Sequence, residues 1–60
     1  MKTLTLGYYN QQGVFHIVNN IKEIAEPAYY VARLSKNGRP YLEVQISPLT
    51  ASLIWQAQHN

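Results

Sequence analysis

The strongest constraint on the fold is the dipeptide Asn37-Gly38, which lies between two runs rich in β-branched and aromatic residues, 29–35 and 41–46. Asn-Gly is the preferred pair for a two-residue type I′ turn, because both turn positions need a positive φ. The sequence therefore predicts a β-hairpin over residues 29–46. A two-residue loop also fixes the register of the paired strands.

That register sorts the side chains of the hairpin onto two faces. The expected pairs are Lys36–Arg39, Leu34–Tyr41, Arg33–Leu42, Val31–Val44 and Tyr29–Ile46. The predicted core face carries Tyr29, Val31, Leu42, Val44 and Ile46, with Arg33 near the turn. The second face carries Tyr30, Ala32, Leu34, Tyr41, Glu43 and Gln45. Two interpretations of this second face stay open: tyrosine tolerates exposure on strands, or Tyr30, Leu34 and Tyr41 contact another subunit, a ligand or the rest of the chain.

A helix is predicted after the hairpin. Ser47 is a good N-cap and Pro48 a good first helical residue. Apolar residues follow at helical spacing, namely Leu49, Leu53, Ile54 and Ala57, with Trp55 beside them. We expect this stripe to pack on the core face of the hairpin, with Trp55 at the edge of the core; a ligand-stacking role for Trp55 is the alternative.

Residues 4–25 allow two interpretations. The apolar spacing of Val14, Ile17, Val18, Ile21, Ile24 and Ala25 matches one face of a helix. Alternatively, 8–9 and 14–18 are strands joined by a turn at Gly13, and Asn20 with Glu23 forms a capping box for a short helix that ends at Pro27. We favour the second, because the residue types suit strands. The prediction is one α+β domain over 1–60, with an antiparallel sheet of three or four strands and a C-terminal helix on one face.

Catalytic and metal-binding groups are scarce. The chain has no Cys and no Asp, and its acids are Glu23, Glu26 and Glu43. The two histidines fall short of the four ligands of a structural zinc site, and His16 lies in an apolar run without a nucleophile or carboxylate near it in sequence. We therefore expect no enzyme activity, no metal, no cofactor and no small-molecule substrate.

A chain of 60 residues buries only about 60% of its unfolded surface, so its core is small. Natural domains of this size gain stability from a disulfide, a metal or a partner subunit. We expect a homodimer. No apolar stretch approaches the roughly 20 residues of a membrane helix, and no signal peptide is visible, so we expect a cytoplasmic protein without membrane contact.

Three cations surround the predicted turn: Arg33, Lys36 and Arg39. Such a positive spot can contact phosphates or an acidic partner. The alternative is that charged residues simply gather at turns.

The chain resembles the DNA-binding half of Phd/YefM-type antitoxins. Residues 1–6 are similar to the first strand of that family, 10–14 fall where its first helix opens, and Asn37-Gly38 with 41–46 and Ser47-Pro48 is similar to its β-turn-β-helix half. Two departures are Gln11, which stands where the family has an arginine, and a longer spacing between the first strand and the turn. The resemblance implies a homodimer that binds operator DNA and a toxin.

Two functions follow as hypotheses. The first is a small non-enzymatic regulator, a dimeric DNA-binding protein of antitoxin or phage type, which contacts DNA or an acidic partner through Arg33, Lys36, Arg39 and Gln11. The second is a protein-binding module encoded by a phage or mobile element that inhibits a host protein. In either case Tyr30, Leu34 and Tyr41 are the expected dimer or partner face.

Overall fold

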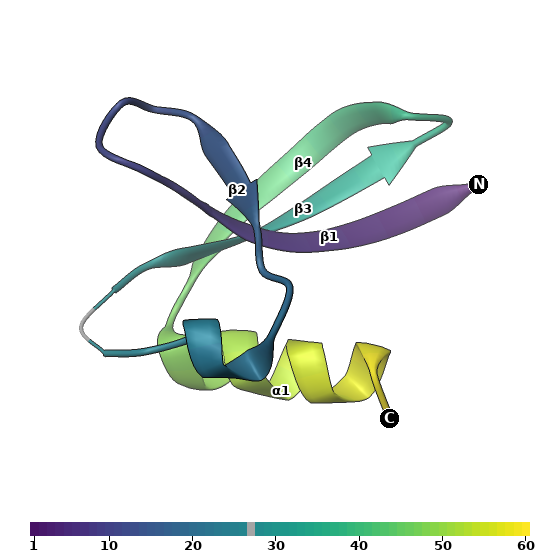
Figure 1. Ribbon diagram of the computed structural model, residues 1–60. Coiled ribbons are helices and arrows are strands. Elements are labelled where there is room, and N and C mark those ends of the chain that lie inside the picture. The colour runs from purple at the N-terminus through teal and green to yellow at the C-terminus, as the bar shows by residue number, and fades with distance from the viewer. Residues whose placement is uncertain (27) are drawn as a thin grey trace.

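The computed structural model describes residues 1–26 and 28–60, and within these ranges four strands form one sheet. The elements are β1 (Lys2–Tyr9), β2 (Phe15–Ile17), the 3₁₀ helix η1 (Ile21–Glu23), β3 (Tyr30–Lys36), β4 (Arg39–Ile46) and α1 (Pro48–Gln58). The strand order is β2-β1-β3-β4, every neighbouring pair is antiparallel, and α1 crosses one face (Figure 1). The predicted α+β fold is confirmed.

The first half of the chain follows the strand interpretation. β1 and β2 form a hairpin whose loop contains Gly13 with a φ of 79°. Asn20 then caps η1 by accepting from the backbone N–H of Lys22 at 2.9 Å, as expected. Glu23 accepts from Asn19 N–H at 3.2 Å and not from the N-cap itself, so the expected capping box is only half formed. The helix ends at Glu23, with Ile24 as its extended C-cap, and so stops before the expected end at Pro27, a residue that itself lies outside the described ranges.

The turn of the second hairpin is also confirmed, but the register beyond it is not. Asn37 and Gly38 have φ values of 54° and 80°, and Lys36 pairs with Arg39. The ladder then shifts by one residue between Leu34 and Ser35, because Tyr41 is an extra residue on β4. A bulge of this kind sets two residues of one strand against one of its partner.

The shift interchanges the two faces of β3. The observed pairs are Tyr30–Ile46, Ala32–Val44, Arg33–Glu43 and Leu34–Leu42, in place of the pairs that we predicted. Residues paired directly across a sheet share a face, so Tyr30, Ala32 and Leu34 lie with the expected core residues of β4. The assignment of Tyr30 to the second face is therefore wrong: Tyr30 is 4% exposed, and Tyr29 is 73% exposed.

The core lies between the sheet and α1. Its buried side chains are Leu6, Val18, Tyr30 and Ala51. The side chains packed around them are Tyr8, Ile24, Ala28, Ile46, Ile54 and Trp55. The hydroxyl of Tyr30 donates to Glu23 C=O and accepts from Ala25 N–H, both at 3.0 Å, and so ties the connection before β3 to the core.

Helix α1 begins where the sequence predicts but presents a different face to the sheet. Ser47 Oγ accepts from Thr50 N–H at 3.2 Å. Leu49 and Leu53, expected to pack on the hairpin, are 68% and 58% exposed, whereas Ala51 is fully buried. The inward stripe is Ala51, Ile54, Trp55 and Gln58. Counted from Ala51, the other three residues follow after 3, 4 and 7 positions, a spacing that places them on one side of a helix. The small side chain of Ala51 allows α1 to approach the sheet closely.

Candidate functional site

Three cations form a row across the sheet next to the hairpin turn. Lys2 on β1 lies directly opposite Lys36 on β3, and Lys36 lies directly opposite Arg39 on β4. Neighbouring strands are about 4.8 Å apart, so the row crosses about 10 Å of the sheet. All three residues are exposed. We call Lys2, Lys36 and Arg39 the basic row.

Lys2 was not among the residues that the sequence analysis selected. It is 34 positions from Lys36, and only the pairing of β1 with β3 brings the two together. No local pattern in the sequence signals such a contact. The predicted positive spot is thus composed differently from our expectation, with Lys2 as a new member.

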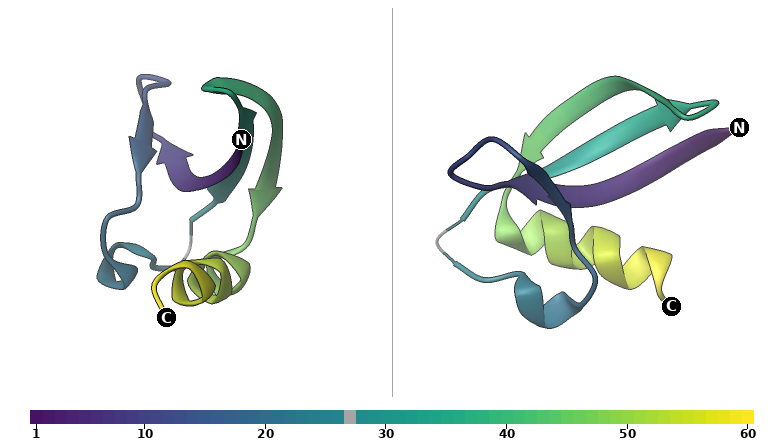
Figure 2. Two further views of the ribbon diagram at one scale, coloured as in Figure 1. Left: turned by 90° about the vertical axis from the view of Figure 1, so that its right-hand side faces the viewer. Right: turned by 45° about the horizontal axis from the view of Figure 1, so that its top comes forward.

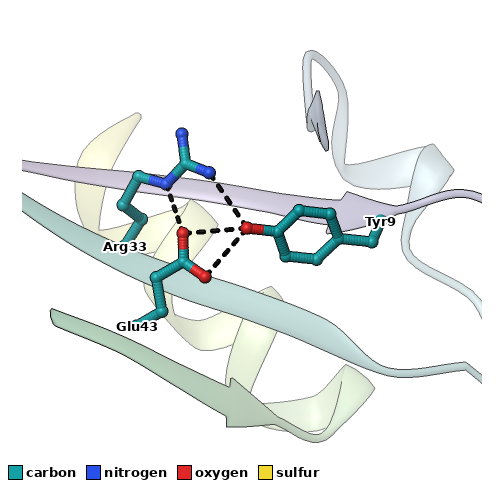
Figure 3. A network of polar contacts seen from close by, with 3 residues as sticks. All are labelled: Tyr9, Arg33 and Glu43. Carbon is teal, nitrogen blue, oxygen red and sulfur yellow. Dashed lines mark hydrogen bonds and ion pairs between the residues drawn. The ribbon is translucent and has the colours of Figure 1, made fainter. Parts of the chain in front are cut away.

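Arg33, the third cation that we predicted for this spot, belongs to a separate polar network with Tyr9 and Glu43 (Figure 3). Its Nε donates to Glu43 at 2.7 Å and its Nη2 to the Tyr9 hydroxyl at 3.1 Å. The same hydroxyl lies 2.9 Å from both carboxylate oxygens of Glu43. The guanidinium carbon also lies 3.8 Å from the centre of the Phe15 ring, a cation–π contact.

This network shifts two protonation equilibria. Hydrogen bonding to Glu43, and then to Tyr9, raises the pKa of Arg33 above its ordinary value. The Arg33 hydrogen bond, and then that of Tyr9, lowers the pKa of Glu43 below its ordinary 4.5. Glu43 therefore compensates the charge of Arg33 at neutral pH, whereas the basic row has no such partner among the hydrogen bonds and ion pairs of the described residues.

The network lies on the face of the sheet away from α1, which we call the helix-free face. β2 and β4 rise on either side of β1 and β3 there (Figure 2, left). Tyr9, Ile17 and Tyr29 are 45%, 56% and 73% exposed. A shallow pocket beside the network is lined by Tyr9, Tyr29, Val31, Glu43, Val44 and Gln45.

The three residues predicted as a partner face do not form one surface. Tyr30 is buried in the core, and Leu34 is half-buried on the side of α1. Only Tyr41 is largely exposed, at 53%, and it lines a shallow pocket with Lys36, Asn37 and Arg39. The bulge at Tyr41 is the physical reason, because a one-residue slip moves a side chain to the opposite face.

Gln11 is exposed in the β1–β2 loop, at the end of β1 remote from the basic row. From Lys2 to Tyr9, β1 extends about 23 Å at the usual rise per residue. The structure therefore does not bring Gln11 together with the predicted cations. The first helix implied by the antitoxin resemblance after residue 10 is replaced here by this loop and β2.

The other sequence candidates have local partners. His16 stacks on Tyr8 with 5.4 Å between ring centres, and its Nε2 lies 2.9 Å from Asn10 Nδ2. Trp55 packs against the core and stacks on His59 at 4.0 Å. Within 1–26 and 28–60, no three His, Cys, Asp or Glu side chains gather as they would to hold a metal ion. No helix of that same part is long and apolar enough to cross a membrane.

Comparison with known proteins found no matching family model, no matching curated protein and no matching solved structure. The antitoxin resemblance accordingly stays a prediction from the sequence.

Proposed function

We propose that the protein is a non-enzymatic regulator that binds nucleic acid, with the basic row in contact with backbone phosphates. The observation that carries this proposal is the placement of Lys2 directly opposite Lys36, with Arg39 next to them. Like charges directly opposite one another destabilise a sheet. A polyanion laid across the row removes this repulsion. Such a regulator works in the cytoplasm, beside its DNA.

The distribution of acids supports this orientation. Glu43 is already bonded to Arg33, and Glu23 lies in η1, which is next to α1 and away from the hairpin turn (Figure 1). The end that carries the basic row therefore has a positive field that attracts anions over a Debye length of about 10 Å at 0.1 M salt.

Phosphate contacts position a protein on nucleic acid but do not read its sequence. Beside the basic row, Tyr41 offers a half-exposed ring in a shallow pocket that Asn37 also lines. The Oδ1 of Asn37 accepts from the Met1 ammonium at 2.8 Å, which leaves its Nδ2 to donate. An aromatic ring can stack on a base and an amide can pair with a base edge. These two side chains are the candidates for base contact.

Fluorescence anisotropy with a labelled duplex from the DNA upstream of the protein's own coding sequence tests the proposal, titrated between 50 and 200 mM salt. Three phosphate contacts give a slope of about −3 for log K against log salt. Lys36→Gln should reduce the magnitude of that slope by about 0.9, because one contact is lost.

Lys22→Gln is the matched control, since it removes one positive charge from η1, outside the row. Its slope should equal that of the unchanged protein. No binding at 50 mM salt, or equal losses from Lys36→Gln and Lys22→Gln, would show that the basic row is not the contact site.

The helix-free face favours a second candidate, a protein-binding module that inhibits a host protein. Exposed Ile17 and Tyr29 share that face with the Arg33 network, whose member Tyr9 is also exposed. Tyrosine and arginine are enriched in protein interfaces. Capture from host lysate by the unchanged protein, by Tyr29→Ser and by Lys36→Gln separates the two functions. A partner lost only with Tyr29→Ser supports this module, and a partner retained equally by all three contradicts it.

A further inference from the structure

Strand β4 is an edge of the sheet, and no other described segment pairs with its outer side (Figures 1 and 2). It is eight residues long, and seven of them are exposed. Leu42 and Val44 are 47% and 48% exposed although they lie on the side of α1. Long apolar edges of this kind are templates for another strand unless they are blocked. The opposite edge, β2, has only three residues.

Hydrogen bonds elsewhere in the sheet reveal which backbone groups of β4 point outward. The carbonyls of Leu4 and Leu6 accept from Gln58 Nε2 and Val18 N–H, each at 2.9 Å, and so point away from β3. In an antiparallel strand the N–H and C=O groups of successive residues point alternately to the two neighbouring strands. The odd-numbered residues of β1 therefore form hydrogen bonds with β3.

The same alternation of N–H and C=O groups applies to β3 and to β4. The odd-numbered residues of β3 bond to β1, so its even-numbered residues, including Ala32, bond to β4. Val44, which is opposite Ala32, therefore directs its N–H and C=O inward. Its neighbours Glu43 and Gln45 direct theirs to the free edge.

We propose that a second copy of this chain pairs with β4 in antiparallel orientation, with the two-fold axis at Val44. Glu43 then lies opposite Gln45 of the partner subunit, and Gln45 opposite Glu43 of the partner subunit. Both are hydrogen-bonded pairs, which exchange two N–H···O bonds each. On the side of α1, Val44 meets the partner's Val44 and Leu42 meets the partner's Ile46, which covers the exposed apolar side chains. This interface is independent of the proposed nucleic-acid function.

Charge, the length of β4 and its bulge together favour this register over the neighbouring ones. Glu43 is the only charged residue in 42–46. An axis at Glu43 sets two carboxylates directly opposite each other, which is unfavourable. With the axis at Gln45, Glu43 lies opposite Ser47 of the partner subunit, which is beyond the end of β4 and so outside the paired strands. An axis at Tyr41 falls on the bulge beside Pro40, which has no N–H.

The axis at Val44 pairs the whole of 42–46 with itself and sets Glu43 opposite a neutral amide. A segment that complements itself in this way is suited to an identical partner. The two sheets join into one of eight strands, and each small core gains the covered surface of β4.

Variants with one introduced cysteine test the register directly, because the chain has no cysteine of its own that could form another disulfide. At the axis, Val44→Cys brings two Cα atoms to about 4.5 Å, within the range of a disulfide. Leu42→Cys is the matched control, with the same strand, the same face and nearly the same exposure. In the proposed dimer the two cysteines introduced at position 42 are offset by four residues along the strands. Their Cα atoms are therefore about 14 Å apart, which is too far for a disulfide.

We expect the unchanged protein to sediment as a dimer at 100 µM, and Val44→Cys to form a disulfide-linked dimer at least ten times faster than Leu42→Cys under mild oxidation. A monomer at that concentration, or equal or faster linkage of Leu42→Cys, would overturn the proposal. Gln45→Pro gives a second measurement, because it removes only an outward N–H. It should sediment as a monomer with the circular dichroism of the unchanged fold, and a folded Gln45→Pro dimer would also overturn the interface.

Discussion

Adjacent tyrosines at 29 and 30 provide a direct test of the register shift in the second hairpin. Tyr29 is 73% exposed and Tyr30 is 4% exposed, so Tyr29→Ser and Tyr30→Ser make the same chemical change in opposite environments. Removal of a buried aromatic side chain costs about 3–5 kcal/mol. The hydroxyl of Tyr30 also bonds Glu23 C=O and Ala25 N–H, and each lost hydrogen bond adds about 1 kcal/mol.

The expected loss for Tyr30→Ser is therefore about 5–7 kcal/mol of the free energy of unfolding. A 60-residue domain has about 3–9 kcal/mol in total, so this variant should be largely unfolded at 25 °C. Tyr29→Ser should change the free energy by no more than about 0.5 kcal/mol, as is usual for exposed positions. Tyr30→Phe, which keeps the ring, should lose about 1–3 kcal/mol.

Urea unfolding followed by circular dichroism and by the fluorescence of the single Trp55 measures all three changes. Agreement between the two signals would support two-state behaviour and permit the comparison of free energies. If Tyr29→Ser lost more stability than Tyr30→Ser, the faces would be those of the unshifted register, and the bulge at Tyr41 would be refuted.

Three further predictions concern individual positions. Gly7→Ala should lose about 1–3 kcal/mol in urea unfolding, since a Cβ there clashes with the backbone carbonyl of His16 and with the Phe15 ring; an unchanged midpoint would contradict the β1–β2 pairing. Gly38→Ala should lose about 1–2 kcal/mol, because Gly38 has a φ of 80°, and a gain in melting temperature would speak against the turn. The lowered pKa of Glu43 gives a stabilisation that is present above 4.5 and is lost as the pH falls through its folded-state pKa. As the pH falls below 4.5, the free energy of unfolding should thus decrease more steeply for the unchanged protein than for Glu43→Gln. Parallel curves of this free energy against pH would argue against the ion pair of Glu43 with Arg33.

Several elements could be predicted because their signals are local. Asn37-Gly38 forms the turn since few other residues adopt a positive φ, and Ser47 starts α1 because its hydroxyl satisfies a free N–H of the first turn. The same holds for Gly13 in the first hairpin and for Asn20 before η1. Each of these depends on a few neighbouring residues.

The candidate sites could be predicted only in part, because each combines residues from separate strands. Lys36 and Arg39 follow from the hairpin, but Lys2 joins them through the β1–β3 pairing. The network of Arg33 and Glu43 likewise needs Tyr9 from β1, which lies far from both in sequence.

By itself the sequence determined the positions of the turns, the start of α1 and an α+β composition, because turn and cap preferences arise within a few bonds of the backbone. Tertiary structure alone decided which side chains face inward. The bulge at Tyr41 buried Tyr30 in place of Tyr29, and the packing of α1 through Ala51 turned Leu49 outward. These choices depend on how a whole strand or helix fills the space against the sheet, and one residue of shift reverses them.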